Sequence, residues 1–136
     1  MINDGMGRFV ADTAIKQMIL AGKAPGKSRV FVLGLTFKEN CPDIRNTKVV
    51  DIVEELEDFG CIVDIYDPWA SAEVVKHEYG KELIAAIDPD KDYQAVIACV
   101  SHNQFKTFDF KKYKDMNAVI FDVKDFVYRD LVDGRL

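Results

Sequence analysis

The chain has 136 residues, is 49% hydrophobic and 30% charged, and carries a formal net charge of −5, which is the profile of one ordinary globular domain. The acidic balance excludes a protein whose main partner is the nucleic-acid backbone, because such a protein needs a basic face. No apolar run approaches the roughly 20 residues of a membrane-spanning helix, and the N-terminus lacks the basic and apolar segments of a secretory signal. We therefore expect a cytoplasmic protein with neither a nucleic-acid nor a membrane partner.

The three cysteines, Cys41, Cys61 and Cys99, are odd in number and widely spaced. This arrangement fits neither a disulfide framework nor a CxxC metal knuckle. We interpret them as reduced thiols and expect no metal site.

The first predicted element is an amphipathic helix over residues 3–21, where apolar side chains recur near helical spacing and Gly22 provides a stop. Residues 24–28 form a predicted turn. The next segment, Arg29–Leu35, is a nearly continuous apolar run, which is typical of a strand buried on both faces.

A second helix is predicted from a cap at Asn46 or Thr47 to a stop at Gly60. Between them, an apolar stripe runs from position 49 to position 59 at helical spacing. Residues 61–66 then form a second strand, and a βαβ unit of this length pairs its two strands in parallel.

The rest of the chain continues this alternation. Helices are predicted over residues 71–79 and 108–116, strands over 93–100 and 118–122, and a short helical or edge element over 82–87. Strands that alternate with helices indicate an α/β fold. We predict a Rossmann-like, doubly wound parallel sheet of about five strands, preceded by the N-terminal amphipathic helix.

A binding site is expected at one edge of this sheet, because ligands of open parallel sheets bind outside the carboxyl ends of the strands. The loops that follow predicted strands bring Lys38, Arg45 and Lys124 to this edge, beside the helix N-terminus near Asn46. Basic side chains, backbone N–H groups and the helix dipole all favour an anion. The pattern therefore favours a phosphate site, although most lysines and arginines of such a protein are simply solvated.

An aromatic residue, Phe37, lies in the first of these loops, where its exposure is costly unless a ligand covers it. The glycine-rich dinucleotide signature is absent, since only Gly34 follows the first strand. Without that signature, Asp67 is interpreted as the first residue of an Asp-Pro turn and not as a ribose ligand.

Cys99 and His102 are close enough in sequence to suggest a nucleophile and its base. A cysteine within an apolar strand is, however, more often a small core residue, and no oxyanion motif accompanies this one. A hydrolytic dyad is therefore the least favoured hypothesis.

The loop GLTFKENCPDIRNT, residues 34–47, resembles the C-terminal signature of the UDP-glucose and GDP-mannose dehydrogenase family. The resemblance continues through residues 49–53 and 63–68 and extends to residues 2–7 and 133–136, so it covers essentially the whole sequence. The FKENCPDIRNT variant is most similar to the branch of the family that acts on UDP-N-acetylhexosamines in polysaccharide synthesis.

The resemblance implies a UDP-binding domain of an enzyme that oxidises the C6 alcohol of a UDP-sugar to a carboxylate, with NAD as the cofactor, through a covalent adduct on a cysteine. By the same resemblance, Phe37 and Lys38 contact the UDP-sugar, and Arg45 reaches toward the NAD diphosphate from across a domain cleft. Lys124 falls where some relatives have a substrate-binding arginine, although lysine does not reproduce the arginine fork.

The resemblance also implies a division of the chain. Residues 1–23 match the end of the central interdomain helix, which lies at the core of a homodimer, and residues 24–136 match the UDP-binding C-terminal domain. The GxGxxG domain and the GGxC nucleophile motif of the family have no counterpart in this sequence. We therefore expect a part of a larger enzyme, inactive alone, with NAD bound mainly by the absent N-terminal domain.

The alternative hypothesis is a stand-alone Rossmann-like binding or regulatory module with no catalytic role. An open reading frame that continues upstream into a GxGxxG domain would distinguish the two hypotheses.

Overall fold

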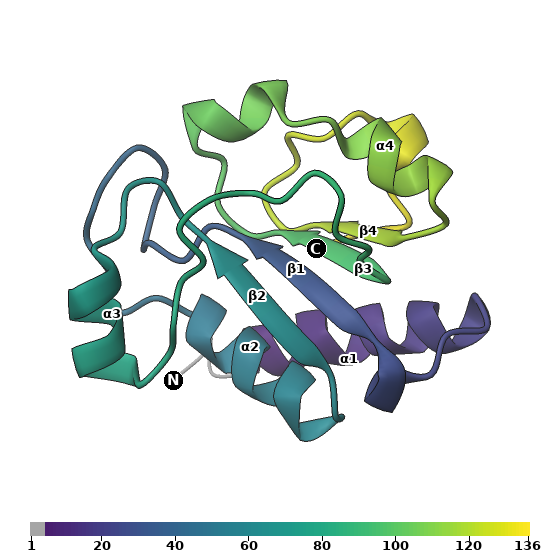
Figure 1. Cartoon of the computed structure of the whole chain (residues 1–136), viewed down its shortest axis with the longest axis horizontal. Coiled ribbons are helices and arrows are strands. Elements are labelled where there is room, and N and C mark those ends of the chain that lie inside the picture. Colours follow the sequence, from purple (N-terminus) through teal and green to yellow (C-terminus); the bar gives the residue numbers. More distant parts are fainter. Residues whose placement is uncertain (1–4) are drawn as a thin grey trace.

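The computed structural model describes residues 5–136 and shows a five-stranded parallel sheet with helices on both faces (Figure 1). The strands are β1 (Arg29–Leu33), β2 (Ile62–Tyr66), β3 (Ala95–Ala98), β4 (Val119–Asp122) and β5 (Gly134–Arg135). The helices are α1 (Met6–Leu20), α2 (Val49–Asp58), α3 (Ala72–Tyr79) and α4 (Phe110–Asp115), with short 3-10 turns at Pro25–Lys27, Asn103–Thr107 and Arg129–Leu131. The predicted α/β fold, parallel sheet and N-terminal helix are confirmed, although position 3, at the predicted helix start, lies outside the described residues.

The sheet has the order β2-β1-β3-β4-β5, and all neighbouring strands are parallel. Along β1, the side chains of Val30 and Val32 enter the core under α1 and α2, whereas those of Phe31 and Leu33 enter a second core under α4. Figure 1 shows α1 and α2 side by side on one face of the sheet and α4 on the other. This double burial explains why β1 is a continuous apolar run and not an alternating one.

Helix α1 packs so closely against α2 that a Cβ atom at Gly7 would lie only 2.7 Å from the Asp51 Cβ atom. Glycine at this position therefore permits the close approach of the two helices. Its buried face includes Val10 and Ala14. The predicted apolar stripe is incomplete, however, since Phe9 and Ile19 are 55% and 57% exposed. None of the helices within residues 5–136 is long and apolar enough to cross a membrane.

Two details differ from the prediction for local reasons. The helix expected over 108–116 begins at Phe110, because the Asp109 carboxylate accepts a hydrogen bond from the Lys112 N–H group at 3.2 Å and caps the helix there. Segment 82–87 has the predicted edge character only at Leu83, which forms an isolated parallel bridge with Ile65.

Candidate functional site

The strand order reverses between β1 and β3, because the chain passes from β1 to β2 on one side and returns to β3 on the other. At such a switch point the loops that follow the two strands separate and leave a crevice. Gly34 begins the loop after β1 with a φ of +95°, and a side chain there would meet the Val100 Cβ atom at 2.6 Å. Glycine thus permits both the left-handed backbone and the contact between the two loops.

A cavity of about 190 Å³ opens at this point, on the sheet face that α1 and α2 cover. The wall combines the loop after β1, the start of α2, the residues that follow β3 and β4, and one residue of α1. The lining residues are Met6, Thr36, Phe37, Asn46, Thr47, Lys48, Val49, Ile52, Cys99, Val100, Val123 and Lys124.

The N-terminus of α2 forms part of the cavity wall. The N-cap residue of α2 is Lys48, and not Asn46 or Thr47 as predicted. The Thr47 hydroxyl nevertheless accepts a hydrogen bond from the Val49 N–H group at 3.1 Å. Asn46 instead has a φ of +61° and makes the left-handed turn before the helix. Backbone N–H groups and the helix dipole give this part of the wall a positive potential, which favours an anionic group.

The structure brings together two of the four predicted site residues. Phe37 and Lys124 both line the cavity, and the Phe37 side chain remains 52% exposed. Lys38 and Arg45 do not line it, although they belong to the same loop. The assignment of all four residues to ligand binding therefore stays a prediction, with Phe37 and Lys124 in the positions that suit it best.

Arg45 is occupied by Asp43 in this structure. Its Nε and Nη2 atoms each donate to a different Asp43 carboxylate oxygen at 3.0 Å, and the arginine side chain is 84% exposed. The side-chain and backbone hydrogen bonds from Arg45 lower the pKa of Asp43 to about 2. The pair is a solvent-exposed fork, the geometry in which a guanidinium group also binds a phosphate.

A buried polar network beneath the loop connects β2, β1 and β3. The Asp67 carboxylate, after β2, lies 3.0 Å from the His102 Nε2 atom, after β3, and both side chains are fully buried. The same carboxylate accepts hydrogen bonds from the N–H groups of Leu35 and Thr36, after β1, at 2.6 and 3.0 Å. Burial by itself raises the pKa of Asp67, but the hydrogen bonds from His102 and the backbone outweigh it and lower the pKa.

The sequence analysis did not predict this network. The interpretation of Asp67 as a turn residue is correct as far as it goes, because its carboxylate also accepts from the Trp69 and Ala70 N–H groups at 2.7 and 3.1 Å. The sequence signal that could have found the pair is positional. Asp67 comes shortly after β2 and His102 shortly after β3, and these two strands lie on either side of β1, so both residues lie at the same edge of the sheet.

The arrangement does not support a hydrolytic dyad. Cys99 is 2% exposed and its pKa is raised by burial, which opposes thiolate formation. Both ring nitrogens of His102 already have partners, in Asp67 and Thr36 on one side and the Asn40 N–H group on the other.

Lys124 is positioned by a second buried carboxylate. Asp122, at the end of β4, is fully buried, and its side chain accepts from the N–H groups of Lys124 and Asp125 at 3.1 and 2.9 Å. Arg135 of β5 donates to the same carboxylate at 3.2 Å and to the Val127 carbonyl group at 2.6 Å. The short β5 strand, which the sequence did not predict, thus helps to shape the loop that carries Lys124.

No cluster of histidine, cysteine and acidic side chains suited to a metal ion occurs in the described part of the chain. The fold and the cavity define a class of protein, namely a doubly wound α/β domain whose switch point presents a cleft suited to a ligand with anionic groups.

Comparison with known families gives a narrower result. The family model described as UDP-glucose/GDP-mannose dehydrogenase family, UDP binding domain, matches residues 31–129. The chain therefore belongs to the UDP-glucose/GDP-mannose dehydrogenase family and corresponds to its UDP-binding domain.

Similar curated proteins agree with this assignment. The chain is 42% identical over 138 residues to the UDP-N-acetyl-D-glucosamine 6-dehydrogenase of Salmonella typhi, and the match covers 99% of this chain and 32% of that protein. It is 41% identical to the enzyme of the same name from Pseudomonas aeruginosa, again over 99% of this chain and 32% of that protein. The chain thus spans about a third of the length of these relatives.

Solved structures show the same fold. The UDP-N-acetyl-mannosamine dehydrogenase from S. aureus superposes with a TM-score of 0.72 at 28% identity, over 98% of this chain and 30% of that one. The NDP-N-acetyl-D-galactosaminuronic acid dehydrogenase from Methanosarcina mazei Go1 gives a TM-score of 0.84 at 19% identity, over 98% and 30% of the two chains.

Proposed function

We propose that this chain is the UDP-sugar-binding domain of an NAD-dependent 6-dehydrogenase that oxidises a UDP-N-acetylhexosamine, or alternatively UDP-glucose, to the uronate. The observation that carries the proposal is the switch-point cavity lined by Phe37 and Lys124 in a chain of this dehydrogenase family. Two relatives at 42% and 41% identity are both UDP-N-acetyl-D-glucosamine 6-dehydrogenases, which favours the acetylated sugar and a role in polysaccharide synthesis.

The cavity offers the two kinds of contact that a nucleoside diphosphate needs. The Lys124 ammonium group and the N-terminal turn of α2 provide positive potential for the diphosphate. Phe37 and Val123 provide apolar surface for a base or a sugar ring. In this proposal the bound ligand covers the exposed part of the Phe37 ring.

Lys38 and Arg45 act outside the cavity in this proposal. Lys38, which is exposed, contacts the sugar part of the ligand, and Arg45 contacts the NAD diphosphate across a domain cleft. To do so, the guanidinium group exchanges the Asp43 carboxylate for a phosphate. The exchange is facile because an exposed ion pair contributes little stability.

The chemistry requires parts that lie in the other two thirds of the relatives. We propose that an N-terminal domain binds NAD and supplies the nucleophilic cysteine, that residues 24–136 bind UDP, and that residues 1–23 end the connecting helix. The 136 residues by themselves then bind nucleotide without oxidising it, and the whole enzyme works in the cytoplasm.

Helix α1 supports the proposal of a homodimer. Its exposed side includes Phe9, Ile19 and Leu20, which are 55%, 57% and 80% exposed. A second copy of the helix would remove this apolar surface from water. Sedimentation velocity should detect a dimer of the chain that Leu20→Glu weakens. A monomer at all concentrations would show that residues 1–136 lack a sufficient interface.

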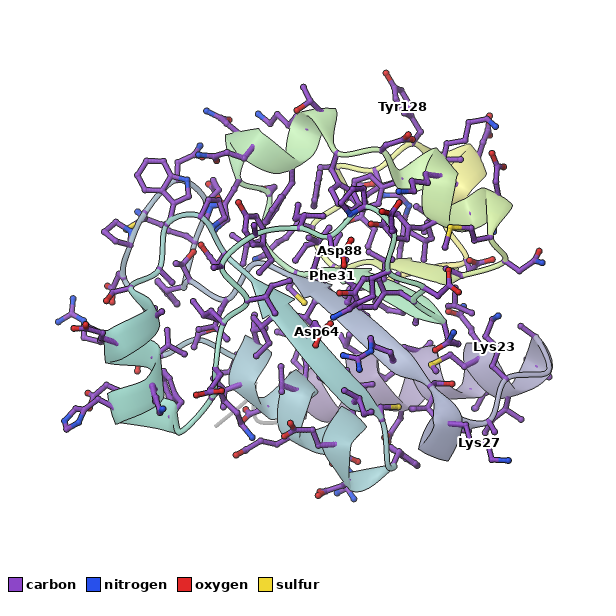
Figure 2. All side chains as sticks on the ribbon, in the orientation of Figure 1. Lys23, Lys27, Phe31, Asp64, Asp88 and Tyr128 are labelled. Carbon is purple, nitrogen blue, oxygen red and sulfur yellow. The ribbon has the colours of Figure 1, made fainter. Side chains whose placement is uncertain are left out.

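Isothermal titration of the chain with UDP tests the binding proposal. Lys124→Ala should weaken UDP binding about tenfold, because it removes a charge-assisted contact of about 1.4 kcal/mol. Lys27→Ala is the matched control, since Lys27 lies just before β1 (Figure 2) and therefore at the amino edge of the sheet, whereas the cavity is lined by residues that follow β1, β3 and β4 at the carboxyl edge. It should leave the affinity unchanged.

Phe37→Ala should weaken UDP binding as well, whereas Tyr128→Ala should not, although Tyr128 is 83% exposed and points into solvent (Figure 2). A folded wild-type chain that releases no heat with millimolar UDP would contradict the proposed function. Equal losses in Lys124→Ala and Lys27→Ala would contradict the location of the site.

A further inference from the structure

His102 lies beneath the loop of residues 36–46 without lining the cavity. Its Nδ1 atom accepts a hydrogen bond from the Asn40 N–H group at 2.9 Å. On the other side of the ring, Nε2 lies 3.0 Å from an Asp67 carboxylate oxygen and 3.2 Å from the Thr36 hydroxyl oxygen. The Thr36 hydroxyl donates its own proton to the Lys38 carbonyl group at 2.9 Å, which leaves its lone pairs toward the ring.

These partners determine where the imidazole proton is. A backbone N–H group only donates, so the Nδ1 atom that faces Asn40 carries a lone pair. An ionised carboxylate only accepts, so the Nε2 atom that faces Asp67 carries the proton. The Nδ1–H tautomer fails on both sides, and the doubly protonated ring places two N–H groups against each other at Asn40.

The contacts of His102 hold the loop at its middle. Asn40 has a φ of +55°, a left-handed conformation that costs energy for a residue other than glycine. The Asn40 side chain also accepts a hydrogen bond from the Asn103 N–H group at 2.9 Å. Residues 102 and 103 thus bind both the backbone and the side chain of Asn40, three residues after Phe37.

We propose that His102, as the neutral Nε2–H tautomer, is a positioning residue that connects Asp67 to Asn40 and holds Phe37 and Lys38 in the conformation that binds nucleotide. This inference rests on the proposed function of the loop. Asp67 is the charged group that faces the ring, and Trp69 and Phe105 contribute aromatic rings at centroid distances of 6.3 and 5.4 Å. The imidazole touches no ligand and acts through the backbone of Asn40.

Two substitutions separate the two ends of the ring. In His102→Asn, the side-chain oxygen takes the place of Nδ1 and continues to accept from Asn40. In His102→Gln, the side-chain N–H group takes the place of Nε2–H and continues to donate to Asp67, but Asn40 loses its acceptor. Both variants remove the ring, so each controls for the loss of packing in the other.

Hydrogen exchange without ligand gives the first measurement. The Asn40 amide should exchange at least about tenfold faster in His102→Gln than in His102→Asn, because only the former leaves that N–H group without a buried acceptor. The affinity for UDP should also fall more in His102→Gln than in His102→Asn. Equal exchange at Asn40 in the two variants, after correction for their global stabilities, would overturn the inference.

The unaltered protein gives an independent measurement if either variant folds poorly. The ¹⁵N and ¹³C chemical shifts of the His102 ring should be those of a neutral ring protonated at Nε2, and a ring protonated at Nδ1 or at both nitrogens would overturn the inference. The two proposals fail separately. If the wild-type chain shows this tautomer and the two variants differ in Asn40 exchange as expected, but the wild-type chain does not bind UDP, the proposed function alone is refuted. If the wild-type chain binds UDP but has another tautomer, the role of His102 alone is refuted.

Discussion

Asp67→Asn is expected to destabilise the fold strongly, although the two side chains have the same shape. One Asp67 carboxylate oxygen accepts from the N–H groups of Trp69 and Ala70, and the other accepts from those of Leu35 and Thr36 and from His102. An amide has only one oxygen. Whichever way the asparagine turns, its NH₂ group faces at least two donors in a buried site.

The expected magnitude follows from that count. Hydrogen bonds to a charged group contribute about 1.5 to 3 kcal/mol each, so the loss of two corresponds to about 3 to 6 kcal/mol of unfolding free energy. Urea unfolding followed by circular dichroism measures this difference. Asp43→Asn is the matched control, because Asp43 accepts from a solvent-exposed Arg45 and its replacement should change little. A loss below about 1 kcal/mol in Asp67→Asn would refute the reasoning, which assigns the stability to hydrogen bonds of the ionised carboxylate.

The same carboxylate predicts a pH dependence. Because hydrogen bonds hold the pKa of Asp67 below its ordinary value in the folded state, its ionised form stabilises the fold above the unfolded pKa of about 3.9. That stabilisation is lost as the pH falls through the lower folded pKa. The wild-type chain should therefore lose stability in acid more steeply than Asp67→Asn, whose side chain does not titrate. Parallel curves for the two proteins between pH 5 and the acid transition would contradict this.

Three further outcomes are expected. Gly34→Ala should lower the unfolding free energy by about 2 to 5 kcal/mol in urea, because Gly34 has a φ of +95° and no room for a Cβ atom; a neutral effect would contradict that geometry. Cys99 should react with a thiol reagent far more slowly than the partly exposed Cys41, since burial raises the Cys99 pKa. Fast labelling at Cys99 would instead support the hypothesis of a hydrolytic dyad with His102. Arg135→Met should cost about 3 kcal/mol by leaving the Asp122 carboxylate without its cation, as judged by thermal unfolding, and should also weaken UDP binding.

Local sequence signals predicted most of the elements because the buried, apolar positions of a helix or strand recur along the sequence at the period of that element. The run Arg29–Leu35 indicated a strand covered on both faces, and β1 is that strand. The same logic failed at β5, whose two residues, Gly134 and Arg135, are too few to show a period. It also overestimated the buried side of α1, where Phe9 has helical spacing but lies in water.

The candidate site was predicted in part. The rule that ligands bind at the carboxyl edge of a parallel sheet selected the loop with Phe37 and the residue Lys124, and both line the cavity. The rule does not say on which side of a loop a side chain lies. For that reason it grouped Lys38 and Arg45 with Lys124 in one predicted phosphate site, whereas in the structure only Lys124 of these three lines the cavity.

The sequence by itself determined the α/β class, the parallel sheet and the position of Phe37 and Lys124 at the carboxyl edge of that sheet, because each depends on local periodicity and on the alternation of strands with helices. The sequence predicted that β2 pairs with β1, but only the tertiary structure decided that β3 lies on the other side of β1, and this brings Asp67 and His102 within 3.0 Å of each other across 35 positions of sequence. Contacts of that kind arise from the pairing of distant strands, which no local pattern records. Phe37 and Lys124, which line the cavity, were therefore visible in the sequence, whereas the contacts of Asp67 and His102 with the loop after β1 became visible only in the fold.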